Sequence, residues 1–171
     1  MKKYELLVDD TITFFGVQLF RIKALISFSG IEKGELGGYI ASEKNLSQYG
    51  NAWVYGDARV YGNARVYGNA WVYGNAWVSG DARVYGDADV YGDARVYGNA
   101  DYIVFKNTWS SGRYFTYTKS NKKWRVGCFY GDGDKLIEKA YKDSKKSGDF
   151  YKAYVDFVEK LEEIENIHKE Q

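Results

Sequence analysis

The sequence predicts a mainly β protein in which a repetitive coil lies between two non-repetitive flanks. Three observations support this fold class: a six-residue repeat from Gly50 to Ala100, alternating apolar and polar residues on either side of it, and two helical segments near the end of the chain. With 171 residues, the chain can bury a core without a disulfide or a structural metal. We expect three consecutive segments, 1–45, 46–105 and 106–171.

The first segment predicts a β-hairpin. Apolar and polar residues alternate in Thr11–Phe15 and again in Val17–Ile22, and Gly16 stands between the two runs. The end of a repetitive β coil exposes an open sheet edge that must be covered. The hairpin is therefore predicted to cap the N-terminal end of the coil.

The second segment repeats the unit Gly-Asn/Asp-Ala-X-Val-Tyr. Ala and Val lie two positions apart, so on a short strand they share one face, while X and Tyr share the other. Gly followed by Asn or Asp tolerates left-handed backbone angles and suits a tight corner. The repeat predicts a chain that turns every six residues, with Ala and Val inside and X and Tyr outside.

This unit resembles the hexapeptide repeat of left-handed parallel β-helix proteins, in which an aliphatic residue and a small residue recur four positions apart. The resemblance implies triangular coils of three units, which would give about three coils between Gly50 and Phe105. Residues 18 apart would then stack, and the corner column Asn63, Asp81 and Asn99 would alternate amides with a carboxylate, which avoids stacked charges. The stretch Lys33–Ser47 resembles the lead-in to such repeats in bacteriophage and prophage proteins.

Within this frame the outward residues fall on three faces. The first face stacks Trp53, Trp71 and Asp89 beside Tyr55, Tyr73 and Tyr91, the second stacks Arg59, Trp77 and Arg95 beside Tyr61, Ser79 and Tyr97, and the third stacks Arg65, Arg83 and Asp101 beside Tyr67 and Tyr85. One interpretation is that these columns only stabilise the sheets. The other is that an aromatic and cationic face binds a partner. The candidate binding residues on the coil are Trp53, Trp71, Trp77, Arg59, Arg95 and Tyr73.

The third segment begins with basic and aromatic residues and no acidic residue up to Gly131. Alternation in Arg113–Thr118 and Lys123–Phe129 predicts a second hairpin, joined through Ser120 and Asn121. One interpretation makes Lys122, Lys123 and Arg125, interleaved with aromatic rings, a site for a nucleotide or single-stranded nucleic acid. The alternative packs the aromatic residues beneath the following helices. Cys128 is expected to be a small core residue.

Two helices should follow the hairpin, completing a ββαα module. The first is predicted to begin at Asp132 or Asp134 and to end near Ser147–Gly148, and the second to begin near Asp149. The second helix carries one apolar stripe, formed by Phe150, Tyr154, Phe157, Leu161 and Ile164. This stripe predicts either packing onto the hairpin or a seam with another copy or a partner.

Composition excludes several classes of site. The formal charge of +1 provides no global field toward nucleic acid or anionic membrane. One Cys and one His exclude an intrachain disulfide and a structural zinc site, so we expect no metal and no cofactor. His168 is expected to be solvated at a helix end. The N-terminus shows no signal-peptide pattern and no apolar stretch reaches membrane-spanning length, which predicts a cytoplasmic protein without membrane contact.

The leading functional hypothesis is a non-enzymatic binding or scaffold protein. The enzymes implied by the resemblance are acyltransferases and gamma-class carbonic anhydrases, which need coil histidines that this sequence lacks. The resemblance further implies a homotrimer and, in a phage-encoded protein, a host defence protein or a nucleotide signal as the target. The alternatives are a divergent acyltransferase with Asp89 or Asp101 as base, and a structural virion or assembly component.

Overall fold

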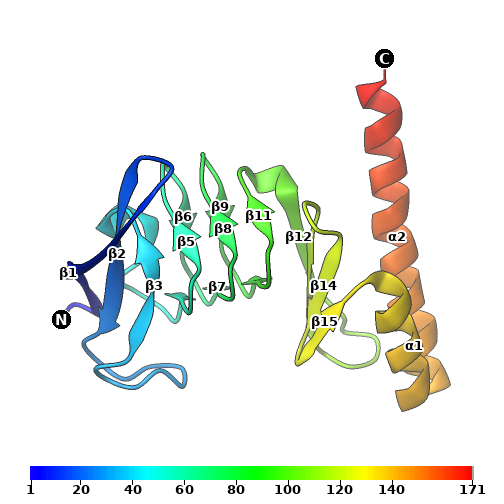
Figure 1. Cartoon of the computed structure of the whole chain (residues 1–171). Helices are drawn as coiled ribbons and strands as arrows, with labels where there is room; N and C mark the ends of the chain where they lie inside the picture. The colour runs from blue at the N-terminus through cyan, green and yellow to red at the C-terminus, as the bar shows by residue number, and fades with distance from the viewer. Residues whose placement is uncertain (171) are drawn as a thin grey trace.

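The coil consists of eight two-residue strands that stack in three parallel sheets. The computed structural model describes residues 1–170 (Figure 1). The strands are β4 (Trp53–Val54), β5 (Arg59–Val60), β6 (Arg65–Val66), β7 (Trp71–Val72), β8 (Trp77–Val78), β9 (Arg83–Val84), β10 (Asp89–Val90) and β11 (Arg95–Val96). Strands β4, β7 and β10 form the first face, β5, β8 and β11 the second, and β6 and β9 the third. Each strand pairs with residues 18 positions away, which confirms the 18-residue turn and gives a β-solenoid of about three turns.

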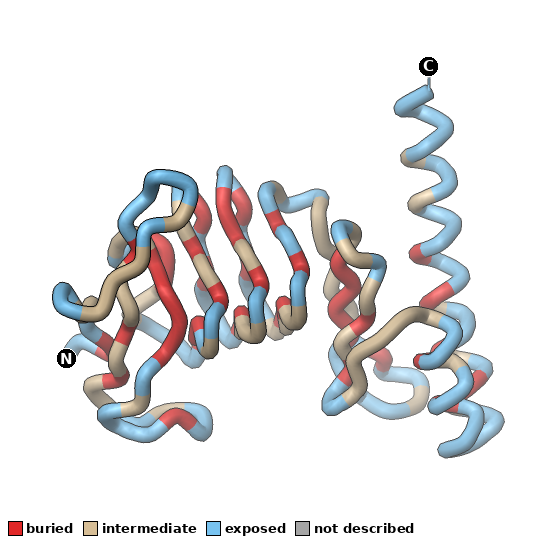
Figure 2. The backbone as a smooth tube through the Cα atoms, viewed as in Figure 1, coloured by how far each residue is buried: buried red, intermediate tan, exposed pale blue. Residues whose placement is uncertain are grey.

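The solenoid core is made of the Ala and Val columns, as predicted. The inward Ala and Val residues from Ala52 to Val96 are at most 1% exposed. Figure 2 shows buried positions alternating with more exposed positions along the coil. The corner glycines from Gly50 to Gly92 have φ between 61° and 73°, the left-handed region that favours glycine. In the predicted corner column, the Asn63 amide donates to the Asp81 carboxylate at 3.0 Å, whereas Asn99 instead accepts from the Arg83 N–H.

The N-terminal segment adds strands to the edge of the second face. Strands β1 (Tyr4–Phe14) and β2 (Val17–Ala24) form the predicted antiparallel hairpin, although it is longer than the alternation indicated. The turn residues Phe15 and Gly16 both have positive φ, the geometry of a tight hairpin turn. Strand β3 (Leu36–Ile40) joins β2 to β5, which gives a six-stranded sheet in the order β1-β2-β3-β5-β8-β11, and the short helix η1 (Glu43–Asn45) leads into the coil.

The C-terminal segment is a four-stranded antiparallel sheet packed on two helices. After the short helix η2 (Asn99–Asp101), the strands are β12 (Tyr102–Lys106), β13 (Tyr114–Thr118), β14 (Lys123–Val126) and β15 (Phe129–Gly131), followed by α1 (Gly133–Asp143) and α2 (Lys145–Lys169). The predicted hairpin is the β13–β14 pair. The boundary predicted at residue 105 falls inside β12, because Tyr102–Lys106 pairs with β13 and not with the coil.

Three details of this segment differ from the sequence-based expectation. The predicted strand to Phe129 is interrupted by a turn at Gly127 and Cys128, so Cys128 is exposed and not a core residue. Helix α2 begins at Lys145, where the Ser144 side chain accepts from the Ser147 N–H, and not near Asp149. The buried face of α2 carries Tyr151, Val155 and Val158, while the predicted stripe Phe150, Tyr154, Phe157, Leu161 and Ile164 lies beside that face and is partly or fully exposed.

Side chains form hydrogen bonds with several of the backbone groups that the solenoid leaves open at its two ends. At the last turn, side chains accept N–H groups on every face: Arg83 N–H is accepted by Asn99 at 2.8 Å, Asp89 N–H by Thr116 at 2.9 Å and Arg95 N–H by Ser120 at 2.8 Å. At the first turn, the Lys3 ammonium donates to Ala52 O at 2.7 Å and the Asn45 amide donates to Ala64 O at 2.8 Å. Residues at both ends of the coil thus supply some of the hydrogen bonds that a further turn would have made.

Candidate functional site

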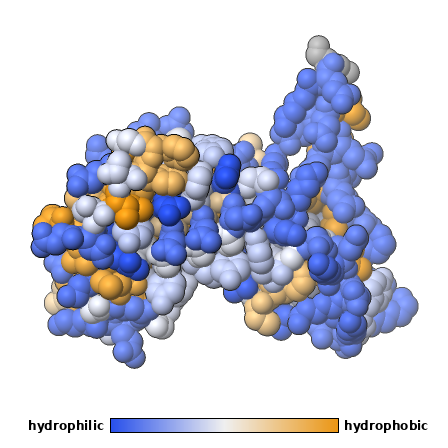
Figure 3. All heavy atoms as spheres, viewed as in Figure 1, coloured by the Kyte–Doolittle hydropathy of each residue, from blue (hydrophilic) through white to orange (hydrophobic). Residues whose placement is uncertain are grey.

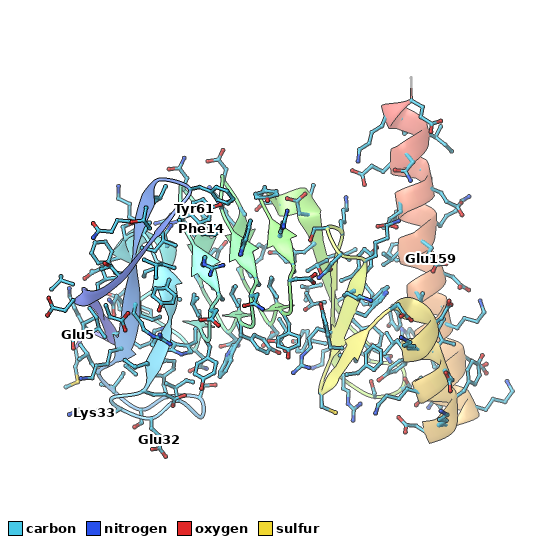
Figure 4. The ribbon with its side chains drawn as sticks, in the orientation of Figure 1. Glu5, Phe14, Glu32, Lys33, Tyr61 and Glu159 are labelled. Atoms are coloured by element: carbon cyan, nitrogen blue, oxygen red, sulfur yellow. The ribbon has the colours of Figure 1, made fainter. Side chains whose placement is uncertain are left out.

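The second face of the solenoid is partly covered by the chain's own hairpin, while Arg95 and Tyr97 on the same face are exposed. The Phe14 ring lies 4.6 Å from the Trp77 ring and 5.8 Å from the Tyr61 ring, and Figure 4 shows Phe14 beside Tyr61. The Arg59 guanidinium lies 4.5 Å from the centre of the Phe14 ring, and the Arg95 guanidinium lies 4.5 Å from that of Trp77. The column Arg59–Trp77–Arg95 therefore exists as predicted, but within this chain its apolar surface already has an intramolecular partner. Figure 3 shows apolar surface gathered at this N-terminal part of the molecule.

Trp53, predicted on the outer surface of the first face, is fully buried. Its ring packs edge-on against Tyr4 at 6.2 Å and Phe28 at 5.3 Å, and its indole N–H has no hydrogen-bond partner among residues 1–170. The six-residue period places Trp53 correctly on the outside of the coil. The N-terminal segment then lies over it, so Trp53 belongs to the core and is removed from the candidate binding residues.

An open groove of about 850 Å³ runs along the first face. Trp71 and Tyr73 line it, and their rings lie 6.4 Å apart and nearly perpendicular. The loop between β2 and β3 contributes Ser29, the loop between β12 and β13 contributes Arg113, and the start of β13 contributes Tyr114. This volume lies in the range typical of ligand sites. The groove unites three of the predicted residues: Trp71, Tyr73 and Arg125.

Arg125 joins the C-terminal sheet to the first face of the solenoid. Its guanidinium lies 5.5 Å from the centre of the Tyr73 ring and 5.0 Å from that of Tyr91, and its Nε lies 3.9 Å from an Asp89 carboxylate oxygen. Burial raises the pKa of Asp89, and the Arg125 charge partly opposes that shift. Burial also raises the pKa of Tyr73 to about 12, with the Asp89 charge acting in the same direction. Arg125 therefore holds the C-terminal sheet against the solenoid, and its positive charge is largely balanced by Asp89 and the two tyrosine rings of the same chain.

The other two basic hairpin residues lie outside the groove. Lys122 occupies the β13–β14 turn with φ of 52°, and its ammonium lies 3.5 Å from the Glu162 carboxylate of α2. Lys123 is half-buried at the start of β14. The aromatic residues of the hairpin, Phe115, Tyr117 and Trp124, are buried in one cluster with α1 and α2. This arrangement matches the packing interpretation of the hairpin.

The remaining candidate residues are distributed across the structure. Asp101 accepts from the backbone N–H of Tyr97 at 2.7 Å and of Gly98 at 2.8 Å, so its carboxylate shapes the turn after the coil. His168 is exposed near the end of α2. Within residues 1–170, no group of three or more His, Cys, Asp or Glu side chains is placed to hold a metal ion. In the same range, no helix combines the length and apolarity needed to cross a membrane.

Sequence reasoning missed two groove residues where the β12–β13 loop enters β13, Arg113 and Tyr114. Both are exposed, and Tyr114 forms a hydrogen bond with Asp87 that raises the Tyr114 pKa. The period of the coil predicts which residues stack within it, but it carries no information on where a loop some 40 residues downstream will lie. The only signal in the sequence that points to Arg113 is the excess of basic residues between 102 and 131, and this excess does not distinguish Arg113 from the other basic residues of the hairpin.

Comparison with known proteins agrees with the geometry of the coil. A family model described as YdcK Beta solenoid repeat matches residues 58–74, which is about one turn of the solenoid. No curated protein matches the chain significantly. The matched segment and the stacked 18-residue turns together identify the chain as a β-solenoid repeat protein.

Proposed function

We propose that this protein is a non-enzymatic binding protein that recognises its partner through the groove on the first face of the solenoid. The observation that carries the proposal is the convergence of half-buried Trp71 and Tyr73 with exposed Arg113 and Tyr114 in one concave surface. Tryptophan, tyrosine and arginine contribute a disproportionate share of binding energy at protein interfaces. The carboxylates of Asp87 and Asp89 balance the two arginines of the groove, which favours a partner of mixed polarity over a polyanion.

The finer parts of the proposal rest on the resemblance of the repeat. We include in it a left-handed hexapeptide coil, a cytoplasmic location, and a bacteriophage or prophage origin in which the partner is a host defence protein or another host factor. We also include a homotrimer. Self-association is supported by α2, which projects beyond the sheet (Figure 1) and exposes Phe157, Leu161, Ile164 and Ile167.

Affinity capture with matched variants tests the groove. Wild-type protein, Trp71→Ala and Trp109→Ala are used as bait in host-cell lysate, because Trp109 is exposed and lies outside the groove. We expect Trp71→Ala to retain about tenfold less partner than wild type, and Trp109→Ala to retain as much as wild type. Thermal unfolding of each bait confirms that it is folded. Equal capture by wild type and Trp71→Ala would contradict the proposal.

A divergent acyltransferase is the second candidate, and it is favoured by one observation. Asp89 lies in the groove with a pKa raised by burial, as a general base requires. Asp101 does not share this position, since it is held by backbone N–H groups. Turnover of acetyl-coenzyme A separates the two functions: the binding proposal predicts no release of free coenzyme A, and release that is lost in Asp89→Asn would favour the enzyme.

A further inference from the structure

The third face carries two arginines that stack directly on one another. Arg65 on β6 pairs in register with Arg83 on β9, and both side chains are exposed. Like charges at directly opposed positions destabilise a sheet. Within residues 1–170 neither arginine forms an ion pair, and neither lies over an aromatic ring as Arg59 and Arg95 do on the second face. The stacked pair is thus an uncompensated positive charge built into the solenoid.

The surroundings of this pair add to its positive charge. Arg65 and Arg83 line a hollow of about 430 Å³ together with Lys44, which makes no ion pair among residues 1–170. The carboxylate in this hollow, Glu43, is neutralised by the Lys2 ammonium at 2.6 Å. Asp101 follows Arg83 by 18 positions, but its carboxylate is engaged by the N–H groups of Tyr97 and Gly98.

Tyrosines accompany the arginines along the same face. Tyr67 and Tyr85 are stacked with ring centres 5.3 Å apart and planes 10° apart, and both are exposed. Tyr49 also lines the hollow and is 85% exposed. Guanidinium groups bind phosphate oxygens in a bidentate manner, and aromatic rings stack on bases. The third face therefore combines phosphate-binding groups with a stacking surface.

We propose that the third face binds a free nucleotide carrying two or more phosphates. Arg65 and Arg83 hold the phosphates, and Tyr49 and Tyr67 receive the base. The cationic pair spans a single inter-strand step of about 4.8 Å, which suits one diphosphate or triphosphate group. A polynucleotide would need a longer cationic track, and the column continues at Asp101, which is acidic. This site is separate from the groove on the first face and does not rest on the function proposed there.

Isothermal titration with ATP at low salt tests the site in the full-length chain. We expect ATP to bind wild type and to bind the double variant Arg65→Ala/Arg83→Ala at least about tenfold more weakly. Pyrophosphate is expected to bind through the same arginines. Tyr49→Ala should weaken the binding of ATP and leave the binding of pyrophosphate unchanged, because only the base reaches that ring. Without ligand, the double variant should unfold at the same or a higher temperature than wild type, since a like-charge contact is removed.

The control is Lys139→Ala/Lys146→Ala, which removes two exposed positive charges from the helical module. It should bind ATP as wild type does, and Trp71→Ala should do so too. The proposal is overturned if wild type does not bind ATP, or if the control loses as much affinity as the arginine variant. The proposal is also overturned if an oligothymidylate of twelve nucleotides binds more tightly than ATP and this binding depends on Arg65 and Arg83. The ligand of the third face would then be a polynucleotide.

Discussion

Trp53 and Trp71 show how one repeat position acquires two different roles. They pair in register on adjacent strands, with the same neighbours in the six-residue unit. Trp53 is fully buried beneath Tyr4 and Phe28, whereas Trp71 faces the groove. The period of the repeat predicts the outward direction of both side chains. It does not predict which of them a flanking segment will cover, because that depends on contacts between residues far apart in the sequence.

The contrast between these two residues predicts opposite mutational effects. Trp53→Ala should lower the free energy of unfolding by about 3–5 kcal/mol, because it leaves a large cavity in the core. Trp71→Ala should lower it by only about 1 kcal/mol and act mainly on partner binding. Urea denaturation of both variants measures the difference. A larger loss of stability in Trp71→Ala than in Trp53→Ala would contradict the assignment of Trp53 to the core.

Among the elements, the helices are less predictable than the coil strands. Gly148 was expected to end the first helix, but it lies inside α2, where a Cβ would come within 2.1 Å of the Tyr141 ring. This glycine permits the close approach of α1 and α2, a tertiary requirement with no signal in local propensity. Of the predicted stripe, Tyr154 packs against Phe105 and Phe115 of the sheet, whereas Phe157, Leu161 and Ile164 are exposed and the fully buried positions lie on the neighbouring face of the helix.

The ends of the solenoid depend on a few side-chain hydrogen bonds, of which Thr116 provides the clearest test. Its hydroxyl accepts from the Asp89 N–H, which has no further turn of the coil to pair with. Thr116→Val keeps the shape of the side chain and leaves that N–H without a partner, so we expect a loss of about 1–3 kcal/mol in unfolding free energy. The control is Thr108→Val on the exposed loop, which should change stability by less than about 0.5 kcal/mol. Equal effects of the two substitutions would argue against the end-closing role.

Lys3 predicts a dependence of stability on pH at the other end of the coil. Burial lowers the pKa of Lys3 from 10.5 to about 8 in the folded chain. Between pH 8 and pH 10.5 the unfolded chain therefore binds more protons at this site than the folded chain. The contribution of Lys3 to the free energy of unfolding consequently rises with pH over this range. Between pH 8 and about 9.5, wild type should gain stability relative to Lys3→Met. Denaturation at the two pH values measures this, and parallel changes in both proteins would contradict it.

For the whole molecule, the solenoid was predictable from sequence and its functional surface was not. The repeat determines the 18-residue turn, the buried Ala and Val columns and the residues that stack on each face. The groove needs two further segments, because loops from both flanks frame it. Partial covering of the second face by Phe14 and Phe15 is likewise a contact between segments. Local periodicity contains none of this information.

Native mass spectrometry of protein purified gently from its own host cells tests the central claim most directly. A surface-recognition protein should carry additional mass from a bound partner or small molecule, and Trp71→Ala prepared in the same way should lose the groove-bound part of that mass. The same spectra report the number of subunits, for which we predict three. Wild-type protein that carries no additional mass, or mass that is retained unchanged in Trp71→Ala, would contradict the account of the first-face groove as the binding site.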